Sequence, residues 1–226
     1  MRFLLAALLA VLSCATGAVA QEKAVRVTGK LPAKALCLIC TQGGETEMER
    51  PAGAVSYKGA TYYFCNNGEI AKFLKDPDAY LPLPVPRPAP AFSLKTPTGE
   101  NVTLASLSGK LVLVDFWATW CAPCVKAMPE MQRLHDAYAA RGFSVVGVSI
   151  DDDGAKKVTP FLAKSRVKFT YPILLDSGTT WQSWGVRAVP SAMLVKDGKI
   201  VAQWSGKIDV KEIEKAVREN LPAADR

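Results

Sequence analysis

Residues 111–124 read LVLVDFWATWCAPC, and this stretch decides the fold of most of the chain. Residues 111–117 are an apolar run broken only by Asp115, which predicts a strand buried on both faces. Apolar residues spaced by three or four positions over 125–138 then predict a helix with one inward face. A buried strand that leads directly into a helix through a C-x-x-C motif places two thiols at the start of that helix.

Cys121 and Cys124 are predicted to be a redox-active dithiol. The free amide groups and the dipole at a helix N-terminus stabilise a thiolate, so Cys121 is the expected nucleophile and Cys124 the thiol that attacks second. The competing interpretations are a structural disulfide and half of a zinc site. A zinc site needs about four ligands, but this domain has no other cysteine, and its only histidine, His135, lies eleven residues further along the same helix. His135 is expected to be an exposed helix residue. A structural disulfide would not need the position that opens a helix.

The segments that follow alternate between strand and helix patterns. Apolar runs and amphipathic spacing predict elements over residues 143–150, 155–164, 191–195, 200–204 and 209–217. Asp197-Gly198 between two apolar runs predicts a hairpin with a type I′ turn. Parallel strands joined by helices, together with a terminal hairpin, predict an α/β fold in which helices flank both faces of a mixed sheet.

Four ordered motifs carry a family resemblance: PAFSL at 90–94, GKLVLVDFWATWCAPC at 109–124, GVRAVP at 185–190 and DGKI at 197–200. Residues from about 89 to 221 thereby resemble the TlpA/ResA-like thiol–disulfide oxidoreductases of the thioredoxin fold. The resemblance implies that Pro190 is a cis-proline opposite Cys121, where the Val189 backbone would pair with a substrate strand. It also implies a helix and a strand inserted around residues 151–175.

Asp115 lies six residues before Cys121, where thioredoxin has its buried acid. The resemblance implies that this carboxylate takes the proton of Cys124. Many relatives carry a glutamate three residues after the second cysteine, but this chain has Ala127, so Asp115 must supply that function. A peroxidase, the competing enzyme class, would need Thr at position 118 and Pro at position 114, which are Ala and Val here.

Residues 1–20 are predicted to be a signal peptide. Arg2 precedes the apolar run 3–12, and Ala18-Val19-Ala20 has the small-x-small pattern of a cleavage site. An uncleaved membrane anchor and a lipoprotein signal at Cys14 are the alternatives. All three predict a periplasmic or otherwise exported protein, and disulfides persist in such compartments.

A proline at every second position over 82–90 predicts an extended, semi-rigid linker. This linker separates a small module, residues 21–81, from a thioredoxin-like domain, residues 91–226. In the module, VSYKGATYYF at 55–64 alternates around Lys58-Gly59 and predicts a hairpin. The fold class is therefore a thioredoxin fold preceded by a small α+β hairpin-helix module.

Three further cysteines lie in the small module: Cys37 and Cys40 in CLIC, and Cys65 at the predicted corner between a strand and a helix. These cysteines, with Tyr57-x-Gly-x-Thr-Tyr-Tyr-Phe-Cys65 and FLKDPDAY at 73–80, resemble the YHS/TRASH-type metal-binding modules. The resemblance implies that Cys37, Cys40 and Cys65 are metal ligands. Where the family often has another cysteine, this chain has Glu69.

Copper or zinc would suit this set, because three thiolates suit copper(I) and an added carboxylate suits zinc. Two alternatives stay open. Cys37 and Cys40 would form a disulfide with Cys65 as a buried apolar residue, or the three thiols would share a second redox couple.

The sequence thus predicts an exported protein-disulfide reductase that needs no cofactor for its redox reaction. The resemblance implies apocytochrome c or copper-handling proteins as substrates, and a membrane or periplasmic thiol protein as electron donor. The alternative is a metal-binding protein or metallochaperone whose thioredoxin domain maintains thiols. The net charge is +7, but the basic residues are scattered, so no nucleic-acid partner is expected.

Overall fold

The structure is a computed structural model that describes residues 22–42, 47–176, 178–206 and 208–222. The predicted signal peptide, residues 1–20, lies outside the described residues. None of the helices in these described ranges combines the length and the hydrophobicity that a membrane span requires.

An eight-stranded mixed sheet forms the larger unit (residues 87–222) in the order β4-β11-β10-β7-β8-β9-β5-β6. β7 (Leu111–Trp117) runs parallel to β8 (Phe143–Ser149) and antiparallel to β10 (Ser191–Lys196). The remaining strands are β4 (Arg87–Pro88), β5 (Ser93–Lys95), β6 (Asn101–Thr103), β9 (Ile173–Leu175) and β11 (Lys199–Ser205). Every residue of β7 and β8 is buried, as the continuous apolar run predicts for a central strand.

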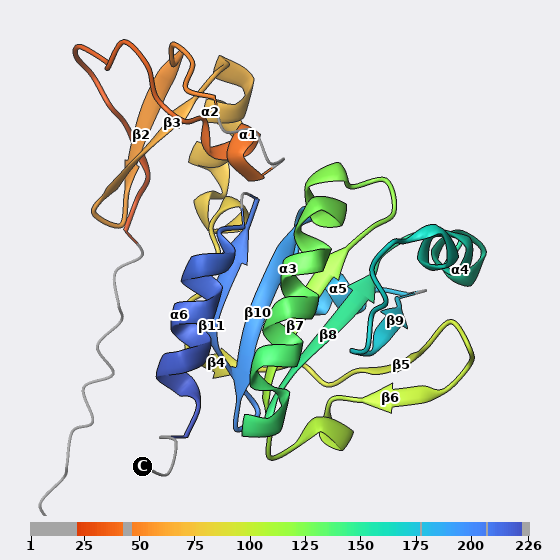
Figure 1. Cartoon of the computed structure of the whole chain (residues 1–226). Coiled ribbons are helices and arrows are strands. Elements are labelled where there is room, and N and C mark those ends of the chain that lie inside the picture. The colour runs from red at the N-terminus through yellow and green to blue at the C-terminus, as the bar shows by residue number, and fades with distance from the viewer. Residues whose placement is uncertain (1–21, 43–46, 177, 207, 223–226) are drawn as a thin grey trace, which may run out of the picture.

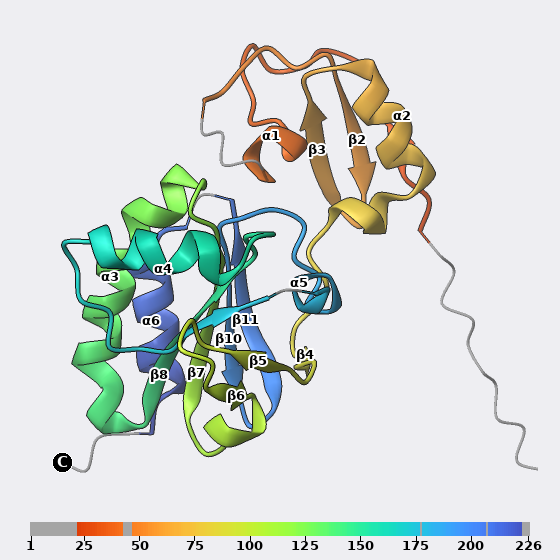
Figure 2. The same ribbon diagram turned by 90° about the vertical axis from the view of Figure 1, so that its right-hand side faces the viewer.

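Helices cover both faces of this sheet. α3 (Ala122–Tyr138), α4 (Ala155–Lys164) and α6 (Val210–Asn220) lie on one side, and the short α5 (Thr180–Ser183) lies on the other (Figures 1 and 2). Three short 3₁₀ helices are η1 (Pro77–Tyr80), η2 (Ala105–Leu107) and η3 (Ala139–Arg141). The predicted α/β thioredoxin fold is confirmed, and α4 with β9 is the predicted insertion. β5, β6 and α5 were not predicted, because each is too short to show a period.

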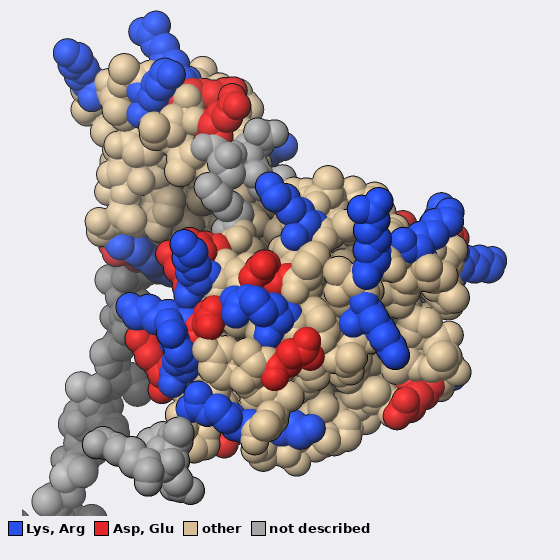
Figure 3. Space-filling view, in the orientation of Figure 1, with Lys and Arg blue, Asp and Glu red and all other residues tan. Residues whose placement is uncertain are grey.

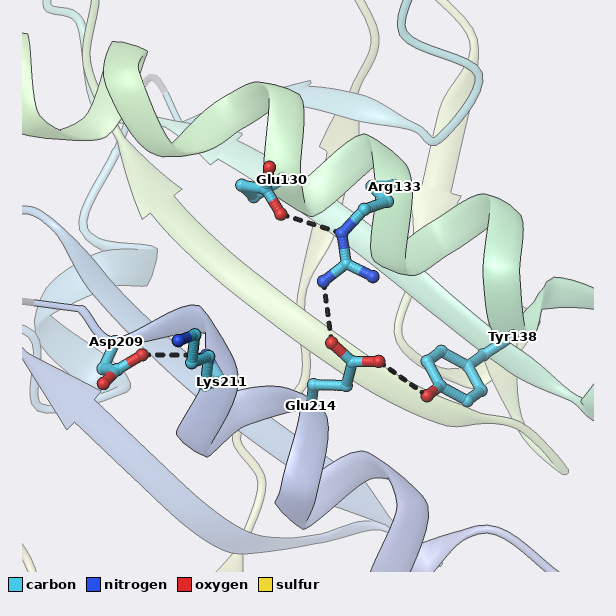
Figure 4. Close-up of polar contacts among 6 residues, drawn as sticks. All are labelled: Glu130, Arg133, Tyr138, Asp209, Lys211 and Glu214. Carbon is cyan, nitrogen blue, oxygen red and sulfur yellow. Dashed lines mark hydrogen bonds and ion pairs between the residues drawn. The ribbon is translucent and has the colours of Figure 1, made fainter.

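A polar clamp joins α3 to α6 at the surface (Figure 4). Arg133 of α3 donates to Glu130 at 2.8 Å and to Glu214 of α6 at 2.7 Å, and the Tyr138 hydroxyl donates to Glu214 at 2.9 Å. The hydrogen bond from Arg133 lowers the pKa of Glu214. Beneath this clamp Met128, Met131 and Leu134 are almost wholly buried. The amphipathic face of α3 therefore anchors the helix, and the clamp adds a contribution of about 1 kcal/mol at most.

The end of the proline-rich segment is part of the larger sheet and not a free spacer. Arg87 and Pro88 pair with Ile200 and Lys199 of β11, so β4 is an edge strand. A proline is tolerated there because its missing N–H faces away from the ladder. The Arg87 guanidinium donates to the Trp184 carbonyl at 3.0 Å. The expectation of a semi-rigid linker through residue 90 is corrected at this point, since pairing to β11 fixes its last part.

The small module has its own sheet and core. β1 (Val25–Arg26), β2 (Gly53–Tyr57) and β3 (Ala60–Phe64) form an antiparallel sheet in the order β1-β2-β3, flanked by α1 (Leu38–Gln42) and α2 (Asn67–Lys75). The predicted hairpin is confirmed, with Lys58 at φ 49° and Gly59 at φ 73° in its turn. Such positive φ values favour glycine and explain why the turn falls there. Phe64, Ile70 and Phe73 form the centre of the core.

The small module contacts the larger unit through α1 and η1. A Cβ on Gly206, at the end of β11, would overlap the carbonyl oxygen of Thr41, so only glycine fits this approach. Arg187 donates to the Asp78 carbonyl at 3.0 Å. Figures 1 and 2 show the module standing over the end of the larger sheet at which α3 begins. On the face in Figure 3, basic and acidic side chains are interspersed.

Candidate active site and thiol cluster

Cys121 and Cys124 lie where β7 passes into α3. Cys121 is the N-cap residue of α3, and its Sγ accepts a hydrogen bond from the Cys124 amide at 3.3 Å. Pro123 follows in the first turn, a position where the missing N–H of proline has no cost. The two sulfurs are bridged by a disulfide. The structure thus holds the pair in its oxidised form, at a helix N-terminus that can stabilise the Cys121 thiolate after reduction.

The disulfide is almost wholly buried, but the tryptophan beside it is exposed to solvent. Cys121 and Cys124 are 5% and 3% exposed, whereas the neighbouring Trp120 is 68% exposed. The expected difference in burial between the two cysteines is small in the oxidised state. Trp120 is a large apolar side chain in water beside the reactive bond, so it offers a contact surface for a partner.

Asp115 is buried in the centre of the sheet. The strand register sets it opposite Gly147 of β8 and Ala192 of β10, and it is 4% exposed. Burial raises the pKa of Asp115 to about 7, because the charged carboxylate loses its hydration. Burial also raises the pKa of Tyr171, and the nearby Asp115 charge adds to this effect. A carboxyl group with a pKa near 7 can take up and release a proton at neutral pH.

The cis-proline implied by the resemblance is present: the Val189–Pro190 peptide bond is cis. Ser191 pairs with Phe116 in the β10–β7 ladder, which brings Pro190 to the end of β7 that leads to Cys121. The Gly206 amide donates to the Pro190 carbonyl at 3.0 Å. Asp115 on β7, Pro190 directly before β10 and the Cys121–Cys124 pair at the start of α3 therefore lie on adjoining elements, but their catalytic roles stay predictions.

Asp151 supports the active-site loop and was not predicted from the sequence. Its carboxylate accepts from the Thr119 amide at 2.9 Å, the Thr119 hydroxyl at 2.6 Å and the Ser149 hydroxyl at 2.8 Å. Asp151 is only 2% exposed. It fixes the loop that carries Trp120 and Cys121. A signal existed, because the carboxyl ends of the parallel strands β7 and β8 meet at one edge, and Asp151 follows β8 there.

His135 is not the exposed helix residue that was expected. Its Nδ1 accepts a hydrogen bond from the Val145 amide of β8 at 3.2 Å. Val145 lies before the stretch of β8 that pairs with β9, so the histidine satisfies an amide that the ladder leaves free. Burial lowers the pKa of His135. The neutral ring is a structural acceptor, not a catalytic base.

The three cysteines of the small module lie together. Cys37 precedes α1, Cys40 lies within it and Cys65 joins β3 to α2, yet their sulfurs all lie within 4.8 Å of one another. The Cys40 and Cys65 sulfurs are 3.6 Å apart. The Glu69 carboxylate accepts from Cys65 at 3.5 Å and from Cys37 at 3.7 Å. All three are free thiols, so a Cys37–Cys40 disulfide is not what the structure contains.

The close approach of the three thiols changes the pKa values of Cys40 and Cys65. The hydrogen bond with Cys37 is the main reason that the pKa of Cys40 is raised to about 12, and burial adds to it. The hydrogen bond with Cys40 lowers the pKa of Cys65, but burial, Cys37 and Glu69 outweigh it and raise the net value. A hollow lined by Cys37, Cys40, Glu47 and Glu49 opens the cluster to solvent. The two glutamates in this hollow were not predicted, since only the fold brings them to the thiols.

Comparison with known proteins agrees with this geometry. Residues 84–217 match the Redoxin family. Thiol-disulfide oxidoreductase ResA of Bacillus thuringiensis (strain Al Hakam) is 32% identical over 126 residues, which cover 55% of this chain and 71% of ResA. Thioredoxin-like protein YneN of Bacillus subtilis (strain 168) is 35% identical over 126 residues, 54% of this chain and 72% of YneN.

Solved structures agree as well. The crystal structure of a thiol:disulfide interchange protein of the thioredoxin family from Chlorobium tepidum TLS has a TM-score of 0.53 and 26% identity, covering 62% of this chain and 100% of that one. The Redoxin match begins at residue 84 and leaves the small module outside, while it includes Asp115, Cys121, Cys124 and Pro190. The chain therefore belongs to the Redoxin family and is a protein-disulfide oxidoreductase of the thioredoxin fold, similar to ResA.

Proposed function

We propose that this chain reduces disulfides in exported proteins through Cys121 and Cys124. The Cys121 thiolate attacks one sulfur of a substrate disulfide, and the other substrate sulfur leaves as a thiolate. Cys124 then attacks the Cys121 sulfur, which releases the reduced substrate and forms the Cys121–Cys124 disulfide. The observation that carries the proposal is the position of Cys121 as N-cap of a long helix, within bonding distance of Cys124.

Asp115 would accept the proton that Cys124 loses before its attack. Its pKa of about 7 suits that task, because a base works best when its pKa lies near the working pH. A substrate strand would pair with the backbone at Val189, beside the cis-proline, and its side chains would contact the exposed Trp120. Both roles follow from the resemblance and fit the burial of the acid and the exposure of the tryptophan.

The test is a trap for the mixed disulfide. In Cys124→Ser, Cys121 still attacks a substrate, but no second active-site thiol is present to break the resulting mixed disulfide. Mixed disulfides should therefore accumulate in cells and be seen on non-reducing gels. The matched control is Cys121→Ser/Cys124→Ser, which should capture nothing. If both variants give the same pattern, Cys121 is not the nucleophile.

The substrate class and the electron donor follow from the same resemblance. We propose apocytochrome c or copper-handling proteins as substrates, and a membrane or periplasmic thiol protein that returns electrons to Cys121–Cys124. The trapped species identify the substrate class by mass spectrometry. The alternative of a metallochaperone with an auxiliary thioredoxin unit is not favoured, because the relatives named above are oxidoreductases that match this unit.

The small module would hold a copper or zinc ion on Cys37, Cys40, Cys65 and Glu69. The donor set fits such an ion, because three sulfurs from different segments lie within 4.8 Å of one another and a carboxylate contacts two of them. A bound ion would protect these thiols from oxidation. Binding would release the thiol protons, so the raised pKa values predict weaker binding as the pH falls.

A further inference from the structure

We infer that Cys40 and Cys65 form a second, reversible disulfide that exchanges electrons with Cys121–Cys124 of the same chain. The inference rests on the proposed redox role of Cys121 and Cys124, and it adds an internal partner for that pair. It concerns the module when no metal ion holds its thiols.

The pair is selected by geometry. The sulfurs of Cys40 and Cys65 are in contact at 3.6 Å, although 25 positions separate the residues in the chain. Both side chains are only half-buried, whereas Cys37 is buried. The C-x-x-C spacing alone would favour Cys37 with Cys40. In this structure the sulfur contact that is both close and accessible joins Cys40 to Cys65.

The position of Cys40 links the module to the active site. Thr41 follows Cys40 directly, and its carbonyl oxygen lies against Gly206 so closely that a Cβ there would overlap it. The Gly206 amide in turn donates to the carbonyl of the cis-proline Pro190 at 3.0 Å. The helical turn that carries Cys40 thus contacts the end of β11 beside the cis-proline. Figures 1 and 2 agree that α1 lies over the end of the sheet at which α3 begins.

The exchange moves two electrons between the two cysteine pairs and needs no oxidant or reductant from outside the chain. The Cys121 thiolate attacks the Cys40 sulfur of a Cys40–Cys65 disulfide, and the Cys40–Cys65 bond breaks with Cys65 leaving as thiolate. Cys124 then gives up its proton and attacks the Cys121 sulfur, and Cys40 leaves. Two electrons have moved from the Cys121/Cys124 dithiol to the module. The products, a Cys121–Cys124 disulfide and free thiols in the module, are the redox state of this structure. The reverse sequence oxidises the module and reduces the Cys121–Cys124 disulfide.

The Asn66 side chain assists the leaving group at Cys65. Its Nδ2 donates to the Cys65 sulfur at 3.8 Å, while its Oδ1 caps α2. The covalent link through residues 82–90 keeps both thiol sites on one chain, so the exchange is an intramolecular reaction at high effective concentration.

Two variants of the full chain, freed of metal by a chelator and kept anaerobic, test the inference. In Cys121→Ser/Cys124→Ser, one molar equivalent of diamide should give a Cys40–Cys65 disulfide in the peptide map. In Cys124→Ser, the same treatment should give a Cys121–Cys40 cross-link within one chain. The yield of that cross-link should not change on roughly tenfold dilution, since dilution affects only reactions between chains.

The matched control is Cys40→Ser/Cys124→Ser, in which disulfides between Cys121 and the remaining module cysteines, Cys37 and Cys65, should total at least about tenfold less than the Cys121–Cys40 link. A disulfide that contains Cys37 as the main product in the first variant would overturn the choice of pair. If Cys124→Ser forms the Cys40–Cys65 disulfide but no disulfide to Cys121, the proposed exchange between the two sites is wrong. Reduction of insulin disulfides by the wild-type chain is measured in parallel. If insulin is reduced but no internal link forms, the inference fails alone; if insulin is not reduced, the proposed function fails.

Discussion

The chain contains two C-x-x-C motifs, and each leads into a helix, yet their sulfurs have different partners. Cys121 and Cys124 open the 17-residue α3 and are bridged to each other. Cys37 and Cys40 flank the start of the five-residue α1 and stay free, and Cys40 contacts Cys65 instead. Identical spacing therefore does not decide pairing. The helix behind the motif and the groups around it do.

The surroundings explain the difference. α3 follows a fully buried strand and buries one face, so its first turn is anchored, and the Cys124 amide donates to the Cys121 sulfur. α1 contains no buried residue, and a third sulfur and a carboxylate lie beside it. One site favours a two-sulfur exchange at a helix N-terminus. The other offers several soft donors around one point, which favours a metal ion or an exchange with a distant cysteine.

The largest effect is expected from Cys121→Ser. It should reduce insulin-disulfide reduction at least about 1,000-fold, because the attacking group itself is lost. Ala137→Ser, on the exposed side of α3, is the control for a serine in this helix. If activity survives in Cys121→Ser and disappears when Cys40 is also replaced, the module performs the reduction. The assignment of disulfide reduction to Cys121 and Cys124 would then be wrong.

Asp115→Asn should stabilise the fold at neutral pH and above. Burial raises the folded-state pKa to about 7, compared with about 3.9 in an unfolded chain. The folded state therefore holds the proton more tightly, and stability is greatest below about pH 4 and is lost as the pH rises towards 7. Removing the charge should recover up to about 4 kcal/mol at pH 8 and nothing near pH 4.

Urea unfolding at the two pH values measures this effect, and the exposed Asp152→Asn is the control. The same variant should slow the release of mixed disulfides at neutral pH. Equal stabilisation at both pH values would mean that the side chain acts through packing and not through its charge.

Cys65→Ser should weaken copper(I) or zinc binding about 100-fold, and Glu69→Gln about tenfold, because a thiolate is the stronger ligand for both ions. Anaerobic titration with a competing chelator gives both affinities. Cys121→Ser/Cys124→Ser should bind as the wild type does, since these residues belong to the other site. Equal uptake by wild type and Cys65→Ser would leave Cys65 without a role as ligand.

The smallest effect is expected at the cap of α2. Asn66 Oδ1 accepts from the Glu69 amide at 2.9 Å, so Asn66→Ala should cost about 1 kcal/mol in the unfolding of the small module. Asn66→Asp keeps an acceptor and should cost much less. Thermal unfolding of the full chain compares the two. If both behave alike, the cap does not hold Glu69 near the thiols.

The elements that the sequence predicts well are those with a local pattern. The run 111–117 is β7 to the residue, and 155–164 is α4. The alternating pattern around Lys58-Gly59 predicts the hairpin, and both turn residues have positive φ in the structure. The cis-proline was expected only through a family resemblance.

What could not be predicted depends on contacts between distant segments. Asp151, which follows β8, accepts from Thr119, which follows the neighbouring β7, and His135 accepts from an amide of β8. Glu47 and Glu49 reach the thiols only through the folded module. No spacing along the sequence marks such contacts, because each depends on how separate elements pack. Only for Asp151 does the meeting of the carboxyl ends of β7 and β8 give a signal. Burial of Asp115 was predicted, whereas the size of its pKa shift depends on the surrounding sheet.

The pairing of β4 with β11 has a consequence for the solubility of the oxidoreductase unit. β11 would otherwise be the last strand of the sheet, with a row of unpaired backbone donors and acceptors that can recruit a strand from another molecule. Arg87 and Pro88 cover the first part of that row, at Lys199 and Ile200, and the proline offers no amide for a further strand. The segment that connects the two thiol sites is thus also a guard against edge-to-edge aggregation. A fragment that began after residue 90 would keep the catalytic motif but lose this protection.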